Sequence, residues 1–337
     1  MDTLTHGLLG LAIGALRKRD GAGARAGAEW SPTDLATSVA CVIAAELPDL
    51  DYLWPSDDAA TSTLRAHRGL SHSLIASPLV AAVAVGIAMV LVRARKRGWA
   101  RPVPVFAFAW VATVVGHLLP DLWTGWGTRL LLPLSDQRLA LDWTMVIDPL
   151  VTLPLAIAAI VAIAWRKRGT STRAVMAVGL AVAGTYVGAR AAAHAYVERR
   201  LATEIAGARE VDAFPTLLRP WTWRWVAAVG DDELVAGTAG LFGGVEEQAR
   251  HRVPRADVLR EASSMGPSVE EALAWARFPL VERSANGREL RVADLRYHFG
   301  GRPTLTFVFE LDARGRVVGS RLDRGGTVRE LMQRWRG

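Results

Sequence analysis

The chain has 337 residues, of which 51% are hydrophobic and 22% are charged. This composition excludes a disordered or collagen-like protein and leaves enough apolar material for a large membrane or core region. The single cysteine, Cys41, excludes an intramolecular disulfide scaffold and a cysteine-rich zinc finger, so any metal has to be held by His, Asp and Glu. The net charge of +7 fits either a nucleic-acid-binding protein or a membrane protein with basic cytoplasmic loops.

Apolar stretches that are nearly free of charge dominate the first two thirds of the chain. Two short ones come first, at 4–16 and 35–47, and their length fits either short spans or the two arms of a re-entrant hairpin. Four others have the length that a helix needs to cross about 30 Å of hydrocarbon. These are 74–92, 103–119, 145–165 and 174–193. We therefore predict a mainly α, polytopic helical membrane domain over residues 1–195.

The charges of the connecting loops predict the orientation of this domain. Lys and Arg concentrate in segments 17–29, 93–102 and 166–173, whereas acidic residues outnumber basic ones in 48–73 and 120–144. By the positive-inside rule the first group is cytoplasmic, and the second lies on the outer side with the N-terminus and everything after residue 194. Arg and acidic residues nearly balance in that last part of the chain. No strongly basic domain is present, and no nucleic-acid partner is expected.

Residues 196–337 have the mixed composition of a smaller soluble α+β domain, predicted on the outer side. Strands are expected at 221–229, 233–240, 289–299, 304–311 and 316–322. Ser268 and Glu271 have the spacing of a capping box at the start of a helix. His251 and His298 are isolated in the sequence, so this domain offers no catalytic motif. We expect it to contact the substrate or a partner, or to cover the membrane domain.

Histidines and carboxylates recur where the apolar stretches reach the outer boundary. In the N-terminal MDTLTHG, Asp2 and His6 lie one helical turn apart. The tetrapeptide LPDL occurs twice, at 47–50 and 119–122, and each proline ends or bends a helix and projects the next carboxylate toward the interface. The segment HRGLSHS at 67–73 adds two more histidines. Taken singly, Asp2 also fits a helix N-terminal acid and HRGLSHS a polar loop with a serine cap.

Donors from these separated segments can converge on a divalent cation. The candidate ligands are His6, Asp49, His67, His72, His117 and Asp121. His117 is the most telling of them, because it interrupts an apolar span, where ionisable residues are usually functional. Neutral imidazole and carboxylate suit Zn²⁺, and further oxygen donors suit Mn²⁺ or Mg²⁺. The set is large enough for two ions that share a bridging carboxylate and clamp the attacking and leaving oxygens of a phosphoester.

Five separated segments, in this order, resemble the YdjM-like family of bacterial inner-membrane proteins, which are predicted metal-dependent hydrolases. They are MDTLTHGLLG (1–10), AELPDLD (45–51), HRGLSHS (67–73), GHLLPDLWTGWGTRLLLP (116–133) and IDPL (147–150). The resemblance covers residues 1–195 and implies a multi-pass location in the inner membrane and a metal site built from the six candidates above. Reserve ligands are Asp2, Glu46, Asp51 and Asp148. A more distant similarity, to zinc-dependent phospholipase C and related nucleases, rests on His117 and Asp121.

These observations predict a membrane-bound, metal-dependent hydrolase that cleaves a phosphoester of a lipid or lipid-linked substrate on the periplasmic side of the inner membrane. Asp51, Arg68 and Arg129 are the predicted catalytic residues, with the two arginines holding phosphate oxygens. A divalent-metal transporter or sensor would use the same donors without hydrolysis, but 74–92 and 174–188 contain no Asp, Glu, His, Lys or Arg. A third alternative is a non-catalytic envelope protein whose C-terminal domain binds a partner.

Overall fold

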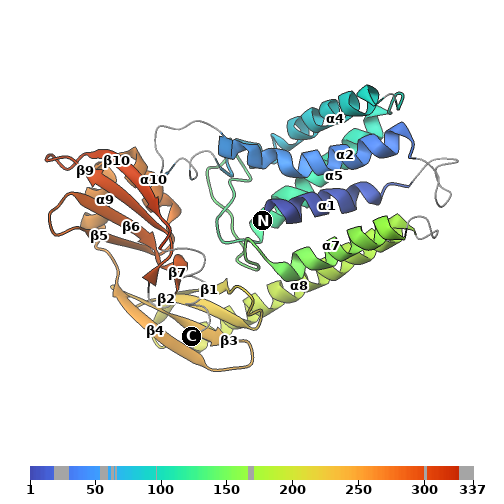
Figure 1. Ribbon diagram of the computed structural model, residues 1–337. Coiled ribbons are helices and arrows are strands. Elements are labelled where there is room, and N and C mark those ends of the chain that lie inside the picture. Colours follow the sequence, from blue (N-terminus) through green and yellow to red (C-terminus); the bar gives the residue numbers. More distant parts are fainter. Residues whose placement is uncertain are drawn as a thin grey trace. The chain divides into compact units, whose positions relative to one another are not determined.

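The computed structural model describes the chain in two compact units (Figure 1). The described residues are 1–18, 30–53, 60, 61, 64, 67–95, 97–165, 171–299 and 302–325. Unit 1 comprises Met1–Leu53 and Arg68–Ala192, and unit 2 comprises Trp54–His67 and Ala193–Gly337. Half of the chain is helical, and the strands concentrate in unit 2. The expectation of a mainly α fold therefore holds for unit 1 alone.

Unit 1 is an assembly of helices. They are α1 (Thr3–Ala15), α2 (Pro32–Glu46), η2 (Leu47–Leu53), η3 (Leu70–His72), α4 (Ser77–Ala94), α5 (Pro102–Thr113), η4 (Val114–Leu118), α6 (Leu119–Leu122), α7 (Pro149–Ala164) and α8 (Thr172–Glu204), the last of which continues into unit 2. Every apolar stretch predicted from the sequence forms a helix. Figure 1 shows α1, α2 and α5 running side by side.

Three helices in the described part of the chain are long and apolar enough to cross a membrane: Ser77–Ala94, Pro102–Leu122 and Thr172–Glu204. Four long spans were expected, and the fourth stretch forms a shorter apolar helix in the described residues, Pro149–Ala164. The stretch 145–165 becomes helical only at Pro149, because Asp148 caps α7 by accepting a hydrogen bond from the backbone N–H of Leu150. The resulting helix has 16 residues and a length of about 24 Å, less than the hydrocarbon thickness.

Small residues allow α1 and α2 to approach closely. A Cβ added to Gly10 would stand 2.5 Å from the backbone oxygen of Cys41, so only glycine fits at this crossing. Alanines of α2, α4 and α5 continue the buried core of unit 1. Asp2 caps α1, where its carboxylate accepts hydrogen bonds from the backbone N–H and the hydroxyl of Thr5. This close packing fixes the N-terminal turn of α1, which carries His6.

Unit 2 contains two four-stranded antiparallel sheets, ordered β1-β2-β3-β4 and β10-β9-β6-β5, and a two-stranded ribbon, β7-β8. The strands are β1 (Ala208–Pro215), β2 (Thr222–Val229), β3 (Glu233–Gly240), β4 (Val245–Arg252), β5 (Pro279–Arg283), β6 (Glu289–Asp294), β7 (His298–Phe299), β8 (Arg302–Pro303), β9 (Thr306–Leu311) and β10 (Val317–Asp323). Trp223 and Trp225 are buried against Val197 and Leu201 of α8. The last turns of α8 therefore form part of the core of this unit.

Two helices, α9 (Ala256–Ser264) and α10 (Pro267–Trp275), complete unit 2. The predicted capping box at Ser268 is wrong. The N-cap of α10 is Gly266, and Pro267 takes the first helical position, which places Ser268 inside the first turn. The predicted strand 289–299 is also interrupted, because the carboxylate of Asp294 accepts the backbone N–H of Arg296 and starts a 3₁₀ turn.

Candidate metal centre

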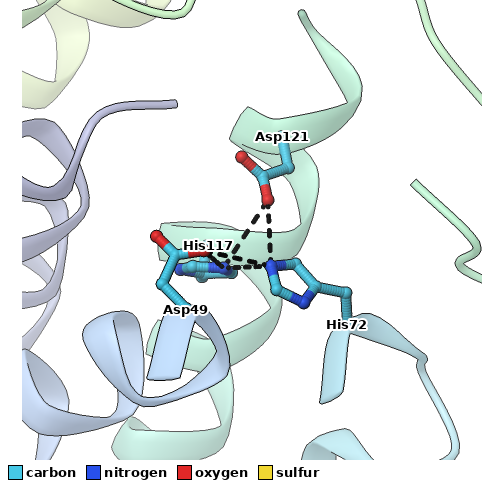
Figure 2. A group of neighbouring side chains, drawn as sticks. All are labelled: Asp49, His72, His117 and Asp121. Carbon is cyan, nitrogen blue, oxygen red and sulfur yellow. Dashed lines mark hydrogen bonds and ion pairs between the residues drawn. The ribbon is translucent and has the colours of Figure 1, made fainter. Parts of the chain in front are cut away.

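Four side chains from separate helical elements of unit 1 meet in one cluster, shown in Figure 2. Asp49 belongs to η2, His72 to η3, His117 to η4 and Asp121 to α6. One ligand atom from each lies within 4.8 Å of the others. His72, His117 and Asp121 are buried, and Asp49 keeps 17% of its side-chain surface exposed. Two imidazoles and two carboxylates form a donor set that suits a divalent cation.

The distances within this cluster are short on every side. Nε2 of His72 lies 3.3 Å from Oδ1 of Asp49 and 3.3 Å from Oδ2 of Asp121. Nε2 of His117 lies 3.6 Å from each of the same two oxygens. The two Nε2 atoms are themselves 3.0 Å apart. Four potential ligand atoms thus point at one small volume.

A change of helix type places two of these ligands. Val114–Leu118 forms a π-helical turn inside the apolar segment that starts at Pro102, and such turns are frequent at functional sites. His117 lies in this turn, and Asp121 follows four residues later in α6, so both face the same side. Each of the two LPDL segments supplies its aspartate directly after a proline, Asp49 in η2 after the end of α2 and Asp121 in α6 after the π-helical turn.

Hydrogen bonds to Nδ1 define which ring nitrogen of each histidine is free to bind a cation. Nδ1 of His117 lies 2.6 Å from the backbone oxygen of Ala45, and Nδ1 of His6 lies 3.0 Å from that of Gly116. A carbonyl oxygen only accepts hydrogen bonds, so Nδ1 carries the hydrogen in both rings. Nε2 of each ring then presents a lone pair. This arrangement, with Nδ1–H held by an acceptor, is the usual one for metal-ligating histidine.

Asp51 orients His72 in the same way. Its Oδ2 lies 3.1 Å from Nδ1 of His72 and also accepts the hydroxyl of Ser71 at 2.6 Å. The carboxylate therefore holds Nδ1–H and turns Nε2 toward Asp49 and Asp121. Nε2 lone pairs and carboxylate oxygens would repel one another at these distances unless a proton or a metal cation lay between them. The residues present fit a bound divalent cation.

Positive groups balance the charge of Asp121 on its other side. Arg68 donates from one terminal nitrogen to Oδ1 of Asp121 at 2.9 Å and from the other to the hydroxyl of Thr124 at 2.8 Å. The amino group of Met1 forms a buried ion pair with the same Oδ1. Nε2 of His6 approaches it at 3.3 Å, and the rings of His6 and His117 stack with centroids 4.0 Å apart. Oδ2 is left to face His72 and His117.

The carboxylates give this cluster a strong preference for positive charge. Burial acts to lower the pKa of His72, but hydrogen bonds to Asp121, Asp49 and Asp51 outweigh it and raise the pKa to about 10. Burial acts to raise the pKa of Asp49. The hydrogen bond from His72 and the nearby histidines outweigh burial, so the pKa of Asp49 is lowered overall. Protons and metal cations therefore compete for the same nitrogen atom of His72.

The other predicted site residues have different surroundings. Arg68 was expected to hold phosphate, but it is buried and its terminal nitrogens are bonded to Asp121 and Thr124. Nε of Arg129 lies 3.4 Å from Oδ1 of Asp136, an ion pair outside the group of four. His67 is buried and belongs to the short segment grouped with unit 2, so its role as a ligand stays a prediction.

Among the reserve ligands, Asp2 and Asp148 cap helices. Asp148 also accepts the hydroxyl of Tyr186 at 3.1 Å. Glu46 ends α2 close to Gly7 of α1, outside the group of four. Sequence reasoning missed Ser71, Thr124 and the backbone oxygens that hold the histidines. Thr124 follows Asp121 by three residues, a helical spacing that offered a signal, whereas the backbone oxygens gave none.

Comparison with known proteins assigns a family to the part of the chain that contains this cluster. The model of the family described as YdjM inner membrane protein matches residues 1–196. The chain belongs to the YdjM inner membrane protein family. No curated protein and no solved structure matches it. The resemblance drawn from the five sequence segments is thereby confirmed, and the cluster and the candidate spans lie almost entirely within the YdjM region.

Proposed function

We propose that the YdjM region is a metal-dependent hydrolase that cleaves a phosphoester of a lipid or lipid-linked substrate at the outer face of the inner membrane. The observation that carries the metal site is the common orientation of His72 and His117, each with Nδ1–H held by an acceptor and Nε2 directed at two aspartates. The location at the ends of apolar helices supports a substrate that is itself held in the membrane.

Asp49, His72, His117 and Asp121 would hold the ion. Two nitrogen and two oxygen donors favour Zn²⁺, with Mn²⁺ as the next choice. The sequence also suggests two ions that share a bridging carboxylate. In the structure Asp121 is the carboxylate that faces both His6 and the other histidines of the cluster. Arg68 already forms an ion pair with Oδ1 of Asp121, where a second ion would bind. We therefore propose one ion, and the ratio of metal to protein distinguishes one from two.

The chain's own residues supply orientation and access. A bound divalent cation lowers the pKa of a coordinated water and neutralises charge on a phosphoryl oxygen. Asp51 holds the ring of His72, and Arg68 holds the carboxylate of Asp121, so both act as positioning residues. Asp49 is the most exposed of the four ligands, and substrate and water would enter on its side. Arg129 stays the proposed contact for phosphate oxygens.

The test is phosphate release by the purified protein in detergent with added Zn²⁺ or Mn²⁺. Phosphatidic acid and an isoprenoid monophosphate serve as probes, because release of phosphate from either of them breaks a phosphoester at a membrane surface. His117→Ala should abolish release, whereas His194→Ala, which changes a histidine outside the cluster, should leave it unchanged. Release that persists in His117→Ala would contradict the proposal. Metal uptake by proteoliposomes without any release would support the transporter alternative instead.

A further inference from the structure

A hairpin of unit 1, residues 129–138, has one apolar arm and one polar arm. Two backbone hydrogen bonds between Thr128 and Leu139, of 2.9 and 3.0 Å, close it at its base. The first arm contains the apolar run LLLPL at 130–134, and the second contains the polar run SDQR at 135–138. An apolar run of this length in a loop that faces water is unfavourable unless it has a function.

The apolar arm is partly exposed and partly packed against the chain that leads into α4. Leu131 is 40% exposed and Leu134 is 83% exposed. The N–H of Leu134 donates to the oxygen of Leu131 at 2.8 Å, so the two belong to one turn. Leu130 is buried, and its oxygen accepts the N–H of Leu74 at 3.0 Å. The hairpin is therefore joined to the residues just before α4.

The exposed apolar side of α4 continues up to this contact. Leu79 and Val83 of α4 are 69% and 45% exposed, and Ile75, one helical turn before Leu79, is 56% exposed. The N–H of Ser77 donates to the oxygen of Ser73 at 3.1 Å, so helical bonding begins before the first residue of α4. Ile75 therefore extends the row of side chains that α4 presents to lipid when it spans a membrane.

The thickness of a bilayer places the contact with the hairpin at membrane depth. α4 has 18 residues and a length of about 27 Å, whereas the hydrocarbon core is about 30 Å thick. Arg93 and Arg95 lie at the C-terminal end of α4 and mark its boundary with water. The remaining thickness therefore lies before Ser77. Leu74, which holds the hairpin, is three residues before Ser77.

We propose that the apolar arm of the hairpin 129–138 enters the interfacial layer of the bilayer at this end of α4, while its polar arm stays in water. The occupant of the apolar surface is lipid, because the arm continues the exposed apolar row of a membrane helix within the same unit. Backbone N–H groups of Leu132 and Ser135 donate to the oxygens of Arg129 and Leu131, at 3.3 and 3.1 Å, and so need no water.

The hairpin is tied to the metal centre through Arg68. The N–H of Arg129 donates to the backbone oxygen of Arg68 at 3.1 Å, and the guanidinium of Arg68 holds Asp121. A lipid beside the apolar arm would therefore lie next to the centre. Insertion of the arm is independent of metal binding, whereas its use as the entry route of a lipid substrate rests on the proposed hydrolase function.

Site-directed spin labelling in proteoliposomes of purified lipids tests this proposal. Cys41 is the single cysteine and is buried, so Cys41→Ala gives a background for one label at a time. Leu134→Cys places the label on the apolar arm. Gln137→Cys is the matched control on the polar arm of the same hairpin, and Val83→Cys on α4 is the reference for a position that faces lipid. All three side chains are exposed, so the labels should not alter the fold.

The relaxation of each label by oxygen, which concentrates in lipid, is compared with its relaxation by a water-soluble nickel chelate. We expect the ratio of oxygen to chelate relaxation at positions 83 and 134 to exceed that at 137 several-fold. Equal ratios at 134 and 137 would overturn the proposal. Weak relaxation of label 134 by both agents would also overturn it, because the arm would then lie against protein. No substrate enters the measurement, so its failure is distinguishable from failure of the hydrolase function.

Discussion

The imidazoles of His72 and His117 in the cluster, and that of the neighbouring His6, each have Nδ1 held by an acceptor, which leaves Nε2 to face the aspartates. For His6 and His117 the acceptor is a backbone oxygen, which no side-chain substitution removes. For His72 the acceptor is the carboxylate of Asp51. Asp51 is therefore the position at which the orientation of a ligand can be changed without removing the ligand itself.

Asp51→Asn should weaken the metal site without abolishing it. An amide is a poorer acceptor for Nδ1–H and can turn its NH₂ toward the ring, so His72 loses its fixed tautomer. We expect the metal dissociation constant to rise roughly 10- to 100-fold, the usual effect of changing the partner of a ligating histidine. Competition with a fluorescent chelator measures it. Asp148→Asn, at a helix cap outside the cluster, is the control, and equal affinities in both variants would contradict the role of Asp51.

The sequence identifies the clustered side chains better than it identifies the groups that hold them. The motifs at 47–50, 67–73 and 116–122 predict all four clustered residues, because each motif is local and its residue types are those of metal ligands. The position of the Arg68 guanidinium depends on a contact between residues 53 positions apart in the sequence. No local pattern carries that information, and a basic residue beside a motif fits a phosphate contact equally well.

Packing between helices determines the positions of His6 and His117. His6 lies on α1, and α1 keeps its place because Gly10 allows contact with the backbone of α2. The π-helical turn of Val114–Leu118 then places His117 against the ring of His6. A change at the crossing of α1 and α2 should therefore reach the metal centre.

Gly10→Ala should destabilise unit 1. The added methyl group would meet the backbone oxygen of Cys41 and the Cβ of Ala45, neither of which can turn away. Overpacking of this kind costs about 1–3 kcal/mol and would shift α1 together with His6. Gly86→Ala on α4 is the control, because nothing lies within 4 Å of its added Cβ. Thermal unfolding in detergent measures both, and equal midpoints would show that the crossing tolerates a side chain.

The sheets of unit 2 contain a pair of histidines that are far apart in the sequence. The rings of His251, on β4, and His298, on β7, meet edge to face with centroids 5.9 Å apart. Burial, followed by His251 and Arg224, lowers the pKa of His298 to about 4, although Asp294 acts in the opposite sense. The folded state thus takes up this proton at a lower pH than the unfolded chain, whose ordinary value is 6.5.

Unit 2 should accordingly lose stability in acid. The contribution of His298 is complete above pH 6.5 and decreases as the pH falls through the interval down to about 4, because only the unfolded chain binds the proton there. Between neutral pH and about pH 5 the loss amounts to about 2 kcal/mol. His298→Gln should reduce this pH dependence, as followed by circular dichroism of the β-sheet signal during unfolding. An unchanged dependence in the variant would assign it to other groups.

At the scale of the whole molecule, composition predicts the division of the chain better than its details. Long apolar runs predict the helices of unit 1, because a membrane segment needs little else. Strands β2 and β3 were predicted, because 221–229 and 233–240 are short, largely apolar segments on either side of the polar Asp231 and Asp232. β4 was missed because it is an edge strand with a charged sequence and largely exposed side chains. Tertiary pairing, not local propensity, makes this segment a strand.

The distribution of Lys and Arg predicts that unit 2 lies on the outer side of the inner membrane. Asp231→Cys in the Cys41→Ala background tests this prediction, because residue 231 is exposed at a loop. A membrane-impermeant maleimide should label it in intact spheroplasts. Labelling that requires prior permeabilisation would place unit 2 in the cytoplasm and reverse the proposed orientation of the site.

The central claim is that Asp49, His72, His117 and Asp121 hold a divalent cation, and elemental analysis tests it most directly. The protein should be purified in detergent through an affinity tag without histidine and reloaded with Zn²⁺ or Mn²⁺. The wild type should contain about one ion per chain, His72→Ala with His117→Ala should contain none, and His194→Ala with His251→Ala should retain it. Metal content in the His72 and His117 variant equal to that of the wild type, or a folded wild type that takes up no metal, would contradict the account.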